Sequence, residues 1–143
     1  MRKLTVLILG ALALIAAACS STPATTSSTT SGAQEITVEA TEFKFAPATI
    51  EVMAGRPVKM TLRNKGAIEH DWAIQKIAVT GMKESAGGGH AMSGADKPAL
   101  HMNAMAGQMG QVEFTPTEKG TYQISCTVAG HKEAGMMGTL VVK

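Results

Sequence analysis

Apolar and polar residues alternate in short segments that recur about every ten residues along most of the chain. Alternation with a period of two places one face of a β-strand against a core and the other face against solvent. Turns that contain Gly or Pro separate the segments, and no segment has a helical period. This spacing predicts an all-β, Greek-key sandwich of about seven to eight strands. The segments are residues 35–40, 49–52, 58–63, 70–74, 112–114, 122–126 and 139–142.

Residues 79–111 interrupt the regular spacing. They are rich in Gly, Ala and Met, and they predict a long inserted loop with a short strand near residues 99–102. Aromatic residues are scarce in the chain, which has three Phe, one Tyr and one Trp. The core must therefore consist mainly of Val, Ile, Leu and Met, with Trp72 as its largest member.

The N-terminal segment has the composition of an export signal. Met-Arg-Lys is followed by an apolar run that ends in small residues before Cys19 and is too short for a confident membrane-spanning helix. Residues 14–19, LIAAAC, resemble a bacterial lipobox, which implies that Cys19 becomes the lipidated first residue of the mature protein. The alternative is ordinary signal cleavage with Cys19 incidental. We expect a signal peptide over residues 1–18 and a lipid-anchored, extracytoplasmic protein.

Two further segments follow the signal. Residues 19–33 are almost wholly Ser, Thr, Ala, Gly and Pro, and with no apolar face to bury they predict a lipidated flexible tether. Residues 34–143 have the size of one domain. Removing Arg2 and Lys3 from the 13 basic residues leaves 11, which balance the 11 acidic ones. A balanced charge without basic clusters argues against nucleic acid as a partner.

The stretch CTVAGHKEAGMM, residues 126–137, concentrates metal-ligand side chains. Strand alternation aims Cys126 inward at the end of a strand, and His131 and Met136 follow at intervals of five residues. A loop of this length can bring the three side chains to one spot, and His70, at the start of a strand after a turn, is the fourth candidate. Two imidazoles, a thiolate and a weak axial thioether form a type 1 copper site. A metal would also protect Cys126, which is otherwise a lone thiol in an oxidising compartment.

Each candidate ligand has a structural explanation when it is taken singly. A buried Cys is often an inert thiol, a His at a strand start is often just polar, and a Met pair can be core packing. Met137 competes with Met136 for the axial position, although alternation already places Leu140 and Val142 inward. The joint spacing and strand context favour one copper ion over these separate readings.

These motifs resemble those of the cupredoxins, the small blue-copper family that includes plastocyanin, azurin and auracyanin. The similarity runs from about residue 35 to residue 143 and is weakest over residues 79–111. It rests on FAPATIEVMAG at 45–55, on Asn64 followed by HDW at 70–72, on FTP at 114–116 with GTY at 120–122, and on C-x4-H-x4-M-x-GTLV from residue 126. The ligand spacing is closer to that of auracyanin-like members than to that of azurin.

The resemblance implies four ligands for one type 1 copper ion, namely His70, Cys126, His131 and Met136, with the pattern G-M-x-G selecting Met136. Two positions depart from the family pattern. Ala129 stands where proline is common before the Gly-His pair. Asp71 stands where asparagine commonly ties the ligand strands together, and its carboxylate can still accept hydrogen bonds.

The segment 79–111 contains its own candidate metal ligands. Histidine and thioether side chains in one loop can form a second, labile copper site, although Met also serves as an adaptable filler that packs on the sandwich. The candidates are His90, Met92, His101, Met102 and Met105.

Two functions from different classes follow from these features. The first is a membrane-anchored electron carrier without enzymatic activity, which we expect to be a monomer that exchanges electrons with other redox proteins. A c-type cytochrome, a membrane respiratory complex, a terminal oxidase and a nitrite reductase are all compatible partners. The second is a copper chaperone or buffer that uses the His- and Met-rich segment.

Overall fold

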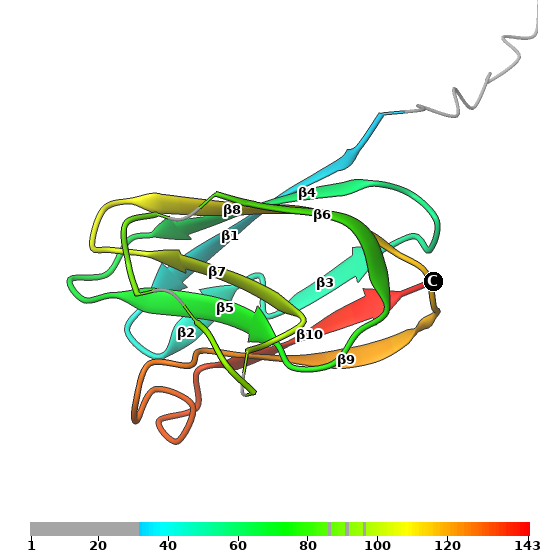
Figure 1. Cartoon of the computed structure of the whole chain (residues 1–143). Helices are drawn as coiled ribbons and strands as arrows, with labels where there is room; N and C mark the ends of the chain where they lie inside the picture. The colour runs from blue at the N-terminus through cyan, green and yellow to red at the C-terminus, as the bar shows by residue number, and fades with distance from the viewer. Residues whose placement is uncertain (1–31, 86, 91, 96) are drawn as a thin grey trace, which may run out of the picture. The chain divides into compact units, whose positions relative to one another are not determined.

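Ten strands form two five-stranded sheets in the computed structural model, which describes residues 32–85, 87–90, 92–95 and 97–143 (Figure 1). The strands are β1 (Gln34–Thr41), β2 (Lys44–Ala46), β3 (Thr49–Val52), β4 (Val58–Asn64), β5 (His70–Ile74), β6 (Val79–Ser85), β7 (Leu100–Ala104), β8 (Met109–Pro116), β9 (Gly120–Ser125) and β10 (Met137–Val142). Within the described ranges, no helix is long and apolar enough to cross a membrane.

Strands from both halves of the domain interleave in each sheet. One sheet has the order β2-β1-β4-β8-β6 and the other has the order β3-β10-β9-β5-β7. β1 pairs with β4 in parallel, as does β3 with β10, whereas the other strand pairs are antiparallel. The predicted all-β sandwich is therefore confirmed.

The core lies between the sheets and follows the predicted alternation. In β4, for example, Val58, Met60 and Leu62 are buried, whereas the residues between them are partly exposed. Trp72 on β5 is fully buried and is the largest buried side chain, as expected. Apolar side chains of both sheets meet in one cluster, which also contains Cys126 and Met136.

The prediction for residues 79–111 was wrong in part, and so was the number of strands. β6 and the first residues of β8 lie in the segment that was expected to be a loop, whereas β7 confirms the short strand expected near residues 99–102. β6 is exposed along almost its whole length. A strand that buries neither face lacks the period-two signal on which the prediction rested.

One end of the sandwich gathers the candidate ligands. The loop between β9 and β10, the turn between β1 and β2, and the turn between β4 and β5 all lie at this end, on the left in Figure 1. The ring of Phe43, in the β1–β2 turn, contacts the ring of His131 in the β9–β10 loop. Segments distant in sequence are thus brought together where His70 begins β5.

Candidate metal centre

The ligand loop between β9 and β10 is closed by backbone hydrogen bonds. The N–H of Cys126 donates to the carbonyl of Met136 at 3.1 Å, and the N–H of Met136 donates to the carbonyl of His131 at 2.9 Å. The N–H of His131 in turn donates to the carbonyl of Val128 at 3.1 Å. These bonds fold the chain back on itself, so Cys126 and His131 lie side by side at the end of β9.

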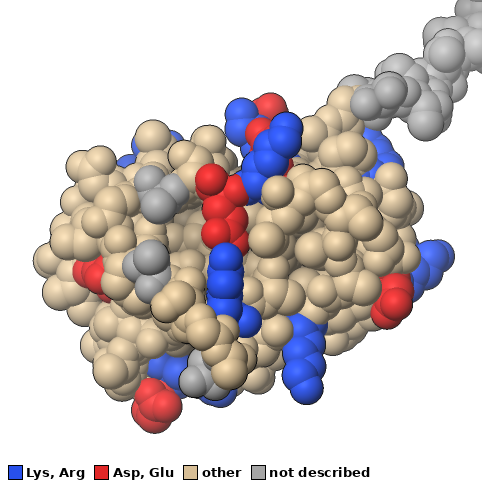
Figure 2. All heavy atoms as spheres, viewed as in Figure 1, with Lys and Arg blue, Asp and Glu red and all other residues tan. Residues whose placement is uncertain are grey.

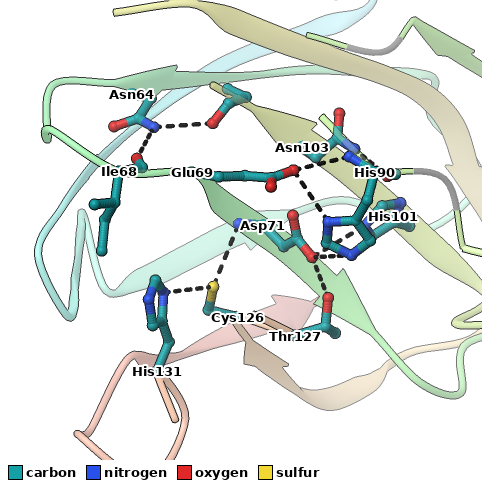
Figure 3. A network of polar contacts seen from close by, with 11 residues as sticks. Asn64, Ile68, Glu69, Asp71, His90, His101, Asn103, Cys126, Thr127 and His131 are labelled. Atoms are coloured by element: carbon teal, nitrogen blue, oxygen red, sulfur yellow. Dashed lines mark hydrogen bonds and ion pairs between the residues drawn. The ribbon is translucent and has the colours of Figure 1, made fainter. Parts of the chain in front are cut away.

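Three of the predicted ligands converge in this loop and the adjacent strand. The ligand atoms of His70, Cys126 and His131 lie within 4.8 Å of one another, and all three residues are buried. Figure 3 shows Cys126 beside His131, and Sγ of Cys126 is 3.3 Å from Nδ1 of His131. The ring centroids of His70 and His131 are 5.2 Å apart. His70 reaches this place because Ala73 of β5 pairs with Ser125 of β9.

Burial distinguishes the two methionines that compete for the fourth position. Met136 has 0% of its surface exposed and belongs to the core cluster, whereas Met137 is 41% exposed. The backbone of Met136 is hydrogen-bonded to both Cys126 and His131. Met136 is therefore the methionine that lies against the buried cluster.

The electrostatics of the cluster suit a metal ion. Burial lowers the pKa of His70 below its ordinary value of 6.5, and the nearby His131 lowers it further. Burial also raises the pKa of the Cys126 thiol above 9.0, while the N–H groups of Asp71 and Val128 act in the opposite direction. Neither ring nitrogen of His70 has a hydrogen-bond partner among the described residues. Buried nitrogens without partners are costly, and a cation would satisfy them and stabilise the thiolate.

Neighbouring residues hold the ligand strands in place. The backbone N–H of Asp71 donates to Sγ of Cys126 at 3.3 Å. The Asp71 carboxylate accepts a hydrogen bond from the hydroxyl of Thr127, so this residue ties β5 to the start of the ligand loop by both its backbone and its side chain. In the β4–β5 turn, the N–H of Ala67 donates to Oε1 of Glu42 at 2.6 Å, and this bond lowers the pKa of Glu42.

The histidines of the segment 79–111 are also brought together, with a partner that the sequence did not suggest. Ligand atoms of Asp71, His90 and His101 lie within 4.8 Å of one another. Met92 and Met102 line a hollow of about 180 Å³ beside His90 and His101, and Met102 also packs into the core.

Other sequence predictions have different outcomes. Met105 is 44% exposed, and it does not line the hollow beside His90. Cys19 lies outside the described residues. The sequence reasoning missed Glu69, whose Oε1 is 3.0 Å from Nδ1 of His90. The run Glu69-His70-Asp71, three consecutive potential ligands, was the available signal, because alternation along a strand turns neighbouring side chains toward different sites.

A two-sheet β-sandwich with a buried Cys-His-His cluster at one end defines a blue-copper protein of the cupredoxin type. The family model described as "Copper binding proteins, plastocyanin/azurin family" matches residues 32–143. The chain belongs to this family, and copper is its cofactor.

Individual relatives agree with this assignment. The chain is 31% identical to auracyanin-A of Chloroflexus aurantiacus over 160 aligned residues, which cover 99% of this chain and 97% of that protein. It is 35% identical over 104 residues to the copper-resistant cuproprotein CopI of Rubrivivax gelatinosus, with 71% of this chain and 61% of that protein covered. The chain thus spans less than two thirds of the length of CopI.

Solved structures confirm the fold. Auracyanin A of Chloroflexus aurantiacus matches with a TM-score of 0.60 at 24% identity, over 78% of this chain and 100% of that one. Auracyanin from Roseiflexus castenholzii matches with a TM-score of 0.59 at 21% identity, over 78% of this chain and 99% of that one.

Proposed function

We propose that this protein carries single electrons between extracytoplasmic redox partners, with one copper ion bound by His70, Cys126, His131 and Met136. The proposal rests on the buried cluster in which ligand atoms of three of these residues lie within 4.8 Å of one another. Bound copper supplies reversible one-electron chemistry between Cu(I) and Cu(II). With four ligand positions filled by protein side chains, the site has no open place for a substrate, so we propose a carrier rather than an enzyme.

The surrounding residues fix the ligands before an electron arrives. Cys126 and His131 are set by the backbone bonds of the ligand loop, and His70 is set by its place at the start of β5. The N–H of Asp71 points at Sγ of Cys126, where it stabilises negative charge on the sulfur. A site that is held rigidly at the end of a β-sandwich moves little when its charge changes, and a small rearrangement permits fast electron transfer.

A path from the buried cluster to the surface runs through aromatic rings. His131 is only 6% exposed, but the ring of Phe43 meets it edge-on, with centroids 5.2 Å apart and an interplanar angle of 85°. Phe43 itself is 40% exposed. Next to His131, the exposed residues of the ligand loop include Ala129, Gly130 and Ala134, which are small and uncharged. Such a surface suits the small, short-lived interfaces of electron-transfer partners.

The N-terminal sequence supports a location outside the cytoplasm, and the ligand set is compatible with several redox partners. We propose that the protein is exported and is anchored to a membrane through a lipid on Cys19. Its electron donor and acceptor are then proteins such as a c-type cytochrome, a respiratory complex, a terminal oxidase or a nitrite reductase. On the face drawn in Figure 2, acidic and basic side chains are interspersed rather than gathered in one patch of a single sign. This mixed charge fits docking through the small, uncharged residues beside His131 rather than through a charged patch.

The test is to add Cu(II) to the purified protein and to record its visible absorption and electron paramagnetic resonance spectra. We expect an intense visible band and reversible one-electron cycling with one copper per chain at this site. Cys126→Ser should abolish the band because the thiolate ligand is lost, while the neighbouring Ser125→Ala should retain it as a matched control. A colourless wild-type protein, or an intense band that survives Cys126→Ser, would refute the proposed site.

The second candidate function is copper handling, in which the bound metal is cargo. It is favoured by the similarity to a protein named for copper resistance and by the Asp71, His90 and His101 cluster. A copper handler should pass its metal to an acceptor protein, whereas an electron carrier should retain copper through repeated oxidation and reduction. Measuring the copper content after such cycling in the presence of a copper chelator distinguishes the two functions.

A further inference from the structure

We propose that Asp71, His90 and His101 form a second metal site, which binds Cu(II) more tightly than Zn(II). This site is separate from the cluster around Cys126 and does not depend on electron transfer. Two imidazoles and a carboxylate are ligands for borderline divalent cations, and at sites of nitrogen and oxygen donors Cu(II) binds more tightly than Zn(II).

The three side chains converge from three segments of the chain. Asp71 lies on β5, His101 lies on the adjacent strand β7, and His90 lies between β6 and β7. Nε2 of His90 and Nε2 of His101 are each 3.3 Å from the same oxygen of Asp71, Oδ2. Figure 3 shows both imidazole rings directed at this carboxylate. Their ring centroids are 6.0 Å apart, so the two rings are not stacked on each other.

A second carboxylate orients the exposed histidine. Oε1 of Glu69 accepts the backbone N–H of His90 at 2.9 Å and lies 3.0 Å from its Nδ1. The side chain of Asn103 donates to the backbone carbonyl of His90 and fixes the same residue from the other side. A carboxylate on Nδ1 leaves Nε2 free to bind a metal, which is the arrangement found around histidine ligands in metalloproteins.

Buried polar atoms at this place lack partners that a cation would supply. Asp71 is fully buried and His101 is 6% exposed. Among the described residues, neither Oδ1 of Asp71 nor Nε2 of His101 has a hydrogen-bond partner, even though Nε2 is close to Oδ2. Leaving such groups unpaired is costly. The competing explanation is a plain His–Asp ion pair, and the titration below separates the two.

Solvent access and the nearby sulfur atoms favour copper. The side chain of His90 is 42% exposed, so an ion can reach the cluster from outside. The hollow of about 180 Å³ that borders His90 and His101 is also lined by Met92 and Met102. Thioethers are soft ligands that suit copper better than zinc, since they also bind the reduced ion.

The experiment is a Cu(II) titration of the purified protein and of Cys126→Ser, followed by electron paramagnetic resonance and by metal analysis after gel filtration. We expect the wild type to bind two copper ions, of which only one adds intense visible absorption. Cys126→Ser should still bind a Cu(II) ion without that absorption. Adding His90→Ala to Cys126→Ser should weaken this Cu(II) binding at least tenfold. Adding Glu69→Gln to Cys126→Ser should weaken the binding about tenfold, because Glu69 orients the ligand His90.

Two controls define the site further. Met105→Ala replaces another exposed residue of the same region and should leave the second copper in place. A parallel titration with Zn(II) should show weaker binding at the same residues. Thermal unfolding of the metal-free variants establishes that His90→Ala is folded, as expected for an exposed side chain.

Several outcomes would overturn the proposal. These are a Cys126→Ser protein that binds no Cu(II), a second copper whose affinity His90→Ala leaves unchanged, and equal loss of that copper in Met105→Ala. Tighter binding of Zn(II) than of Cu(II) would also contradict it. If the wild type lacks intense visible absorption but retains a copper ion that His90→Ala removes, the proposed electron carrier fails and the second site stands.

Discussion

Asn64→Ala tests how the turn before His70 is held. Asn64 ends β4, is 2% exposed and makes three hydrogen bonds with its side chain. Its amide donates to the carbonyls of Ile68 at 2.6 Å and Ala104 at 2.9 Å, and its Oδ1 accepts the N–H of Gly66 at 2.8 Å. Figure 3 shows two of these bonds. They connect the β4–β5 turn, which leads directly into His70, to the end of β7.

The size of the effect follows from the three bonds. A net contribution of about 1 kcal/mol for each bond gives a loss of about 3 kcal/mol in the free energy of unfolding. For a domain of this size, about 4 °C of melting temperature corresponds to 1 kcal/mol, so the melting temperature should fall by about 12 °C. The loosened turn should also speed the loss of copper to a chelator, because His70 follows it.

Differential scanning calorimetry of the metal-free protein measures the change in stability, and stopped-flow mixing of the copper protein with a chelator measures the release. Gln111→Ala is the matched control, because it removes one partly buried bond of 3.1 Å to the hydroxyl of Thr61. We expect the control to lower the melting temperature by no more than about 4 °C and to leave copper release unchanged. Equal decreases in the two variants would refute the reasoning.

Three other substitutions or conditions test the site. In urea denaturation of the metal-free protein, Met136→Ala should lower the free energy of unfolding by about 2–5 kcal/mol, whereas Met137→Ala, at an exposed position, should change it by less than about 0.5 kcal/mol. Similar values for the two variants would contradict the assignment of Met136 as the buried methionine. Gly66→Ala should perturb the visible band of the copper protein, since an added Cβ would lie 2.9 Å from Nε2 of His70 and 2.7 Å from Oε1 of Glu42. An unchanged spectrum would contradict this, because it would mean that the turn moves to accommodate the Cβ without displacing His70. Because the pKa of His70 is lowered from 6.5, the unfolded chain binds more protons than the folded one, and the metal-free protein should lose stability as the pH falls from 6.5 through the folded pKa. Urea denaturation at several pH values measures this loss, and a stability that does not fall would argue against a buried, neutral His70.

The sequence was most informative where a strand has one buried face. In the sequence of β4, apolar Val58, Met60 and Leu62 alternate with polar residues, and the same three side chains are buried. β6 could not be recognised in the same way, because it is exposed along almost its whole length. The short strand expected near residues 99–102 corresponds to β7, but the sequence did not show that His101 lies on a strand paired with β5.

The same distinction applies to the candidate sites. Cys126 and His131 are close in sequence, so a single loop brings them together, and the spacing of their motif was sufficient to relate them. His70 lies close to Cys126 and His131 because β5 pairs with β9. The resemblance to cupredoxins implied this strand pairing, and no local sequence pattern did. The meeting of His90 and His101 with Asp71 depends on the register of β5 and β7, and no local pattern specifies that register.

The bonds that close the ligand loop run between backbone groups. Besides those at Cys126 and Met136, the N–H of Ala134 donates to the carbonyl of Gly130 at 3.0 Å, and the N–H of Gly135 donates to that of Lys132 at 3.0 Å. Side chains such as Lys132 and Glu133 point outward and are exposed. Exchanging them would alter which proteins recognise this end of the molecule while the chain geometry beneath stays the same. Natural divergence or engineering can thus change the choice of docking protein without rebuilding the metal pocket.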